Sequence, residues 1–415
     1  MSAAPRATVQ TAQALPAMSW AQEETDLTYA WPYVCPSFLA GAEAVLPEMR
    51  PWHTIALRSR GELALLPGYV LEAPPAVDHD PRTYLGWQAA TGEEVCCGID
   101  LPCELSAEVD ALGLDAFFPC LLLGSPLGYR TEVAYNFWTP RLFDEMVAVL
   151  TARAFDEGIR SVLAPWIPDR EGNAALVAAL VQGGGHHAFW GYDDYVPLSG
   201  KDWDAHLASL PIKMRQRIVA DERKAAASGV AIDRVDGDAI RPHVQRIAEL
   251  NCLNRAKNGA GEEVEHIVGV LGALLDVGAD VRAYLATLDD RVVGSCVVLR
   301  KERRLFAKWV GFDYEAVGDR SGIYFALAID SPVRDACAEG LASVEFGAGA
   351  HQAKRLRGSS SRAVTTVLAV ADPALRPDVT RYMDLFGRAR HVAFGDAVPA
   401  LDVAPASEER LVAPR

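Results

Sequence analysis

The 415-residue sequence lacks an apolar run long enough to span a bilayer, and its first 20 residues lack the apolar block of a secretory signal. It also lacks an excess of positive charge. The formal net charge is −15, which argues against general binding to a polyanion, because nonspecific nucleic-acid binding needs a widespread excess of Lys and Arg. We therefore expect a cytoplasmic protein with no membrane span and no DNA partner, in which any RNA contact uses a local basic patch.

Several catalytic motifs are missing as well. No Gly-x-Ser-x-Gly elbow, Walker loop or His-Glu-x-x-His pattern occurs, which argues against the hydrolase and nucleotide-binding classes that carry them. The eight cysteines include no CxxC pair, as is typical of a reducing compartment. Cys96, Cys97 and Cys103 lack a nearby fourth ligand, and the pair His186-His187 lacks partners of its own, so we predict no metal site.

What is present is a chain too long for one ordinary core, with half of its residues hydrophobic. In the first half, residues 53–72 are predicted to form a hairpin, 117–126 a central strand, and 142–158 a helix with one apolar face. In the second half, residues 204–228 are predicted to form one long charged helix, and 281–312 three strands joined by tight turns. Strands that alternate with helices and hairpins predict a mixed α/β fold.

The most informative segment follows Phe346, where a strand-like run gives way to Gly-Ala-Gly-Ala and then to the cations Lys354, Arg355 and Arg357. Glycine after a strand lets the backbone approach a ligand closely, and nearby cations are able to hold an anionic group or a developing oxyanion. A group-transfer site is one interpretation. A tight turn leading into a solvated basic face is the other.

The order helix, strand, Glu-Phe-Gly, small residues, Lys, Arg-Gly resembles the C-terminal signature of the FemABX-like transferases, a branch of the GNAT acyltransferase superfamily. Residues 210–230 are similar to the linker and first helix of the second domain of that group, and the two resemblances together cover roughly residues 190 to 370. The resemblance implies tandem GNAT-like domains, each a mixed, largely antiparallel sheet flanked by helices. The predicted division is a flexible N-terminus 1–25, an N-terminal domain 26–198, a C-terminal domain 199–395 and a flexible tail 396–415.

The resemblance also implies roles in catalysis. Lys354 matches a lysine that stabilises the tetrahedral intermediate of aminoacyl transfer, although Ala353 stands where the family has phenylalanine. Glu345 is a candidate carboxylate partner for Lys308 or the base that deprotonates the attacking amine. Lys308 lies in an apolar strand, where we expect it to face a cleft or pair with a carboxylate, unless it extends to solvent from an edge strand.

Other residues are candidates for contacts with substrates. Tyr324 lies near the position where GNAT enzymes bind an acyl carrier, with a core tyrosine as the alternative, and His351 and Arg357 belong to the segment after Phe346. On the acceptor side, arginines beside aromatic residues follow two predicted strands, where they are suited to holding a carboxylate or phosphate, or serve simply as loop anchors. These acceptor-side candidates are Tyr129, Arg130, Trp166, Asp169 and Arg170.

The donor is expected to be an aminoacyl-tRNA, with no tightly bound cofactor. The segment Gly318–Ile323 lacks the density of glycines that holds the pyrophosphate of coenzyme A in related acetyltransferases, so acetyl-CoA is the alternative. Lys213, Arg217 and Lys224 share a helical face suited to an RNA acceptor stem, unless nearby acids simply balance them. The acceptor is expected to be the amine of a small metabolite in bacterial natural-product biosynthesis; a repurposed scaffold that acts with a small partner protein is the further alternative.

Overall fold

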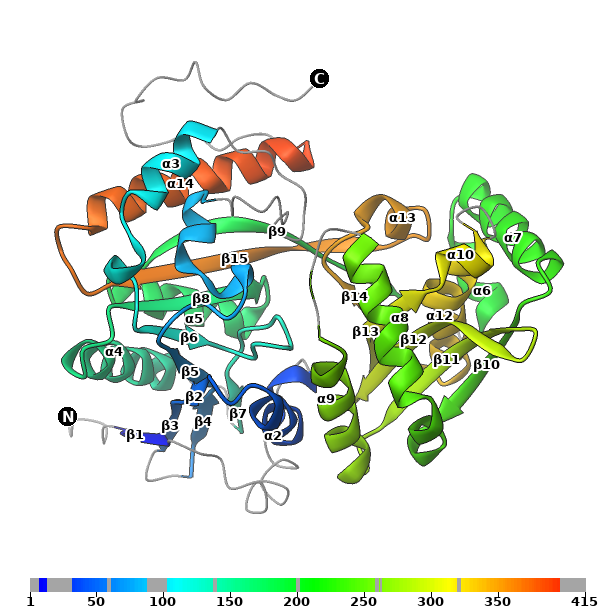
Figure 1. Cartoon of the computed structure of the whole chain (residues 1–415), viewed down its shortest axis with the longest axis horizontal. Helices are drawn as coiled ribbons and strands as arrows, with labels where there is room; N and C mark the ends of the chain where they lie inside the picture. The colour runs from blue at the N-terminus through cyan, green and yellow to red at the C-terminus, as the bar shows by residue number, and fades with distance from the viewer. Residues whose placement is uncertain are drawn as a thin grey trace. The chain divides into compact units, whose positions relative to one another are not determined.

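The structure is a computed structural model that describes residues 7–12, 32–57, 61–87, 103–136, 140–198, 202–257, 261, 263–318 and 322–395. These residues fall into two compact units, the first within residues 1–191 and 363–415 and the second within 192–362 (Figure 1). The chain passes from the first unit to the second inside strand β9 (His186–Pro197) and returns inside strand β15 (Ser360–Val370).

The first unit is built on two sheets. One has the strand order β1-β3-β4-β7, and in the other β15 is followed by β8, β6, β5 and β2. Strands β6 and β8 run parallel, while β15 and β5 pair antiparallel to their neighbours. The bounds are β1 Thr8–Ala12, β2 Arg50–Pro51, β3 His53–Leu57, β4 Leu63–Leu66, β5 Gly68–Leu71, β6 Cys120–Leu123, β7 Ala134–Tyr135 and β8 Ser161–Pro168. The predicted hairpin is therefore the β3–β4 pair, and the predicted central strand is β6.

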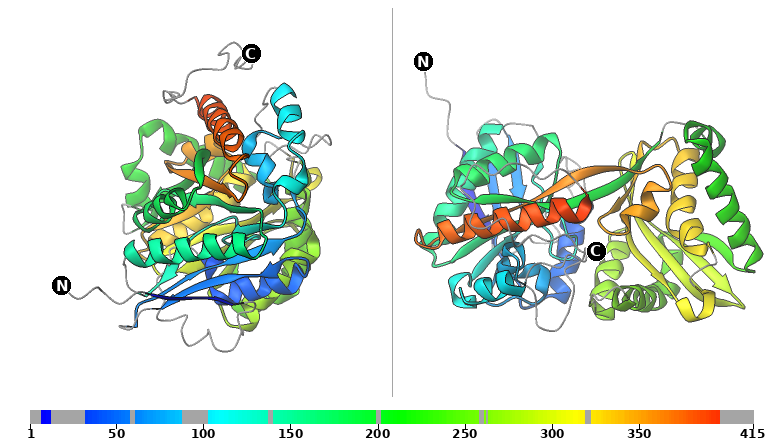
Figure 2. Two further views of the ribbon diagram at one scale, coloured as in Figure 1. Left: turned by 90° about the vertical axis from the view of Figure 1, so that its left-hand side faces the viewer. Right: turned by 90° about the horizontal axis from the view of Figure 1, so that it is seen from above.

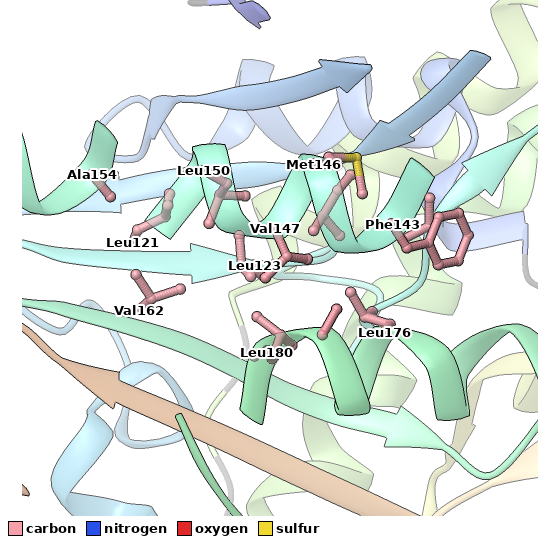
Figure 3. Packing of buried hydrophobic residues seen from close by; sticks show 14 of the residues in the cluster. Leu121, Leu123, Phe143, Met146, Val147, Leu150, Ala154, Val162, Leu176 and Leu180 are labelled. Carbon is pink, nitrogen blue, oxygen red and sulfur yellow. The ribbon is translucent and has the colours of Figure 1, made fainter. Parts of the chain in front are cut away.

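The core of this unit lies between helices α4 (Pro140–Asp156) and α5 (Glu171–Gln182) and the strands beside them (Figure 3). The apolar stripe predicted for residues 142–158 is buried, because its members recur at helical spacing on one face of α4. Those members are Phe143, Met146, Val147, Leu150 and Ala154. Helix α14 (Arg376–Phe394) covers β9 (Figure 2). Gly387 of this helix lies close to the backbone of Phe189.

The shorter helical segments of the first unit lie in its connections. They are η1 Pro32–Val34, α2 Pro36–Val45, η2 Val77–His79, η3 Pro81–Leu85, α3 Cys103–Asp110 and η4 Leu114–Ala116.

The second unit has one sheet in the order β10-β11-β12-β13-β14-β9. Strands β10 (Ala231–Asp236), β11 (Val281–Leu288), β12 (Arg291–Lys301) and β13 (Arg304–Phe312) form an antiparallel meander, as predicted. Asp289 and Asp290 both have positive φ, which is the backbone of a tight hairpin turn. Strand β14 (Ser343–Gly347) pairs parallel with the start of β13 and antiparallel with β9.

Helices cover this sheet. Helix α8 packs so closely on β13 that a side-chain carbon at Gly311 would lie 2.2 Å from the backbone of Leu250, which explains the glycine there. The π-helical turn η6 and helix α12 pack on a separate apolar cluster that includes Val298 and Phe312. The helical bounds are α6 Trp203–Ser209, α7 Ile212–Ala227, η5 Gly237–His243, α8 Val244–Lys257, α9 Val264–Asp276, α10 Tyr314–Val317, α11 Ile323–Phe325, η6 Ala326–Asp330, α12 Ser331–Ala338 and α13 His351–Arg355.

Three features differ from the sequence predictions. The predicted helix 204–228 is two helices, because Pro211 at the N-cap of α7 cannot continue the preceding helix. Residues 363–395 lie in the first unit rather than with 199–362, because β15 pairs with β8 there. Within the predicted flexible segment 1–25, Thr8–Ala12 form a strand that pairs with β3. Residues 1–6 and 13–25, and the predicted flexible tail 396–415, lie outside the described residues.

Candidate active site

The turn between β14 and α13 is held together by Lys354. Gly347, Gly349 and Ala350 all have positive φ, a conformation that glycine adopts without steric cost and alanine rarely adopts. This path brings three backbone carbonyls to one point, where Lys354 Nζ donates to the oxygens of Phe346 at 3.2 Å, Gly347 at 2.6 Å and Ala348 at 3.2 Å. Lys354 is buried, and its ammonium group therefore fixes the shape of the turn.

A substitution in this turn tests its left-handed geometry. No heavy atom lies within 4 Å of a side-chain carbon built at Gly349, so G349A adds backbone strain without a clash and should cost about 1 kcal/mol of the free energy of unfolding. The matched change G272A, in the middle of α9 and equally open, should instead stabilise the chain by about 0.5 to 1 kcal/mol. Urea denaturation of both variants measures the two signs. Equal changes in the free energy of unfolding of G349A and G272A would show that the positive φ of Gly349 does not determine the effect of the substitution.

Asp194 on β9 connects this turn to β15. Its carboxylate, fully buried, lies 2.6 Å from Nδ1 of His351, accepts a 2.6 Å hydrogen bond from Oγ of Ser361, and lies 3.8 Å from Nζ of Lys354. Burial alone would raise the pKa of Asp194. The hydrogen bonds from His351 and Ser361 and the charge of Lys354 outweigh burial and lower that pKa below its ordinary value, so Asp194 carries a negative charge.

Glu345 belongs to a neighbouring ion pair. Its two oxygens accept from Oγ of Ser343 at 2.7 Å and from the guanidinium of Arg362 at 2.5 Å. Burial would lower the pKa of Arg362, but the charge of Glu345 beside it raises that pKa above its ordinary value. The guanidinium also lies 4.0 Å over the ring of Tyr195. Glu345 is thus paired with Arg362, and its predicted roles as a partner of Lys308 and as a base stay predictions.

Arg357 takes part in a different buried cluster. Its guanidinium donates to Asp330 at 2.9 Å and to Asp221 at 2.9 Å, and it stacks 4.0 Å over the ring of Phe325. These contacts tie the end of the turn to η6 and α7, so Arg357 holds together helices of the second unit. A role in binding substrate stays a prediction.

The carboxyl group of Asp330 makes stability depend on pH. Burial raises the pKa of Asp330 to about 7, although Arg357 opposes the shift. In the unfolded chain an aspartate titrates near 4, so between about pH 4 and about pH 7 the folded chain holds a proton that the unfolded chain has lost. Stability from this group is therefore complete below about pH 4 and is lost as the pH rises towards about 7. In D330N, which cannot titrate, the free energy of unfolding should gain on the wild type between about pH 4 and about pH 7; a constant difference in urea denaturation would refute the assignment.

Lys308 and Tyr324 lie elsewhere in the second unit. Val297 pairs with Trp309 and Val298 with Ala307, so Lys308 is the extra residue of a β-bulge, a device that redirects a side chain. Tyr324 packs against Phe312 with ring centroids 5.7 Å apart, and burial raises its pKa to about 12. Both proposed roles stay predictions, and residues 319–321 of the segment predicted to disfavour coenzyme A lie outside the described residues.

The basic residues predicted to contact RNA are exposed on α7. Lys213, Arg217 and Lys224 point to solvent, and the last two lie 3.9 Å and 3.8 Å from Asp221. The nearby acid therefore balances part of this face, as the alternative interpretation holds. An RNA contact there stays a prediction.

The acceptor-side candidates are grouped in the first unit. Tyr129 and Trp166 both have positive φ, and their rings meet edge to face with centroids 5.1 Å apart. Arg130 is buried and donates to the carbonyl of Tyr129 at 2.6 Å. Asp169 is exposed, and Arg170 is the N-cap residue of α5. Strained backbone at paired aromatic residues is typical of functional sites, and a binding role here stays a prediction.

Four members of these clusters were not predicted from the sequence: Asp194, Ser361, Arg362 and Asp330. A signal for Asp194 exists, because the acidic pair Asp193-Asp194 interrupts an otherwise largely apolar strand, and acids are rarely buried there unless paired. Ser361 and Arg362 carry no such signal. Among the described residues, no group of three or more His, Cys, Asp and Glu side chains is placed to hold a metal ion, and no helix in those same ranges has the length and apolarity of a membrane span.

The chain matches the model of a known protein family. A family model of FemAB-like proteins, described as peptidoglycan biosynthesis/recognition, matches residues 107–394, more than half of the chain. A comparison with curated proteins gives no match.

Solved structures support the same fold. The crystal structure of FemX is 9% identical, with 89% of this chain and 99% of that chain covered and a TM-score of 0.55. A conserved protein of unknown function from Bacteroides thetaiotaomicron VPI-5482 is 10% identical, with 88% and 100% covered and a TM-score of 0.51. A tandem GNAT protein from the clavulanic acid biosynthesis pathway is 12% identical, with 89% and 99% covered and a TM-score of 0.47. At such identities the likeness to the first two concerns the fold, and it confirms the predicted α/β class.

Proposed function

The chain belongs to the FemAB-like family and is a transferase, and from this premise we propose that it moves an aminoacyl group from an aminoacyl-tRNA to the amine of a small metabolite. The reaction joins the acyl carbon of an ester to an amine nitrogen. Its transition state carries negative charge on the carbonyl oxygen and a proton to be removed from nitrogen.

The buried cluster at the turn between β14 and α13 is the observation that carries this proposal. The buried carboxylate of Asp194 lies 2.6 Å from Nδ1 of His351 and 3.8 Å from Nζ of Lys354, so it brings an imidazole and an ammonium group to one charged site. Charges held in a dry, preorganised site act on a developing charge more strongly than they would in water. Such a cluster is suited to acyl transfer.

Aminoacyl-tRNA is proposed as the donor because the chain offers a basic face to RNA. The exposed cations of α7 give a local basic face on a protein whose net charge is −15. A donor of this kind confines the reaction to the cytoplasm. Acetyl-CoA remains the alternative donor.

For the acceptor, a second candidate is the amine of a peptidoglycan precursor. The description of the family as peptidoglycan biosynthesis/recognition favours it. The small-metabolite amine and the precursor amine undergo the same chemistry, so the identity of the acceptor changes the binding residues and leaves the transfer step unaltered.

The test uses the full chain with tRNA charged with radiolabelled amino acids and a panel of acceptors that includes diamines, amino sugars and a lysine-containing peptidoglycan precursor. We expect an amide product whose formation stops when ribonuclease is added first. Product that forms with acetyl-CoA and survives ribonuclease would replace the donor. A chain that uses neither donor and copurifies with a small partner protein would overturn the proposal.

A further inference from the structure

His351 and Asp194 form a histidine–carboxylate pair within the second unit. Nδ1 of His351 lies 2.6 Å from Oδ2 of the carboxylate, and Ser361 occupies the other oxygen at 2.6 Å, so both oxygens of Asp194 are engaged and its plane is held. The neighbouring residue Ala350 has φ 47°, and Lys354 fixes the turn from inside. The imidazole is thus held at Nδ1 by Asp194, and its backbone is held by the turn that Lys354 fixes.

Resting on the proposed transfer, we infer that His351 is the general base that takes the proton of the attacking amine, and that Asp194 positions it. A charged carboxylate accepts hydrogen bonds and cannot donate them, so Nδ1 carries the hydrogen, and in the neutral imidazole the lone pair is then on Nε2. Nε2 is buried, and the side chain is 15% exposed, so the base is shielded from bulk water.

The step balances in protons and bonds. The amine nitrogen attacks the ester carbonyl carbon, a C–N bond forms, and the nitrogen gives one proton to Nε2 of His351. The C–O bond to the donor then breaks, and the imidazolium returns the proton to the departing oxygen. One ester and one amine become one amide and one alcohol, with His351 unchanged.

The other polar groups of the cluster are less suited to this task. Both oxygens of Glu345 are engaged, by Ser343 and by Arg362, in an ion pair. Lys354 is a cation whose three donors point at backbone carbonyls. A neutral imidazole is the group that takes and returns a proton near neutral pH.

Steady-state transfer by the full chain tests the assignment with H351N, D194N and H186Q. Asparagine at 351 keeps a donor towards Asp194 but removes the base, so kcat should fall about 100-fold or more while KM for the amine changes less than about threefold. D194N should lower kcat at least about tenfold by favouring the wrong tautomer. H186Q is the matched control, because His186 pairs with Asp384 at 2.8 Å in the first unit, and its kcat should stay within about twofold of wild type.

Nitrogen-15 NMR of histidine-labelled protein supplies a readout that needs no activity. The signals of His351, assigned by their loss in H351N, should show a protonated Nδ1 and an unprotonated Nε2, and D194N should change that tautomer. If transfer occurs and H351N keeps a kcat within about threefold of wild type, the inference is overturned while the proposed function stands. If no donor supports transfer, the proposed function falls. The NMR signals then test the pairing of His351 with Asp194 by themselves: an unprotonated Nδ1 overturns it, and a protonated Nδ1 upholds it.

Discussion

Replacing Arg357 with methionine should lower the free energy of unfolding by about 3 to 5 kcal/mol, the cost of breaking a buried ion pair from one side. The guanidinium is 2% exposed and bonds two buried carboxylates, Asp221 and Asp330, at 2.9 Å each. Methionine fills similar volume against Phe325, so lost packing is a minor part of the effect. What remains is Asp221 without its buried cation, and Asp330, whose pKa burial already raises to about 7 and which must take up a proton once Arg357 is gone.

Urea denaturation of R357M measures this cost, and K224M is its control. Lys224 lies 3.8 Å from the same Asp221, but its side chain is 63% exposed, so its removal should change stability by less than about 0.5 kcal/mol. Adding D221N and D330N to R357M should recover part of the loss, since neutral amides leave no uncompensated charge. A loss below about 1 kcal/mol in R357M would show that the cluster is better hydrated than its burial indicates.

Much of the fold was predictable from local pattern. The stripe on α4 and the meander β11–β13 follow from periodicity and from turn residues such as Asp289 and Asp290, which act within a few positions of the chain. The return of β15 to the first unit was not predictable in this way. It depends on pairing between β15 and β8, whose residues are about 200 positions apart, and nothing in a local window encodes that partner.

In the candidate site, too, local features were predictable from the sequence and long-range contacts were not. Lys354 was identified from a glycine-rich bend, which has a local signature, and the bend is real: Gly347 and Gly349 have the positive φ that the chemistry of glycine allows. Its charged neighbour Asp194 lies 160 positions earlier on β9, and the contact exists only because β9 pairs with β14. The position of Lys354 was therefore predictable from the sequence, whereas the hydrogen bonds that set its role were not.

Replacing Lys354 with methionine should cost about 2 to 4 kcal/mol of stability, because three carbonyls at one buried point lose their donor. Transfer should fall about 100-fold or more, since the turn that carries His351 would no longer be held. Urea denaturation and steady-state kinetics on the same preparation measure the two effects. K213M, an exposed lysine on α7, is the control for stability and should stay within about 0.5 kcal/mol of wild type.

These two measurements on K354M separate two tasks of one ammonium group. A lysine that only stabilises an oxyanion would lose activity on replacement and leave the free energy of unfolding within about 0.5 kcal/mol of wild type, because its donors would be bonded to substrate only in the transition state. A lysine that holds the turn must destabilise the resting protein when it is removed, whatever it does during the reaction. The three carbonyl contacts favour the second result, and in that case the charge of Lys354 acts on the reaction through the shape of the turn and through Asp194 at 3.8 Å.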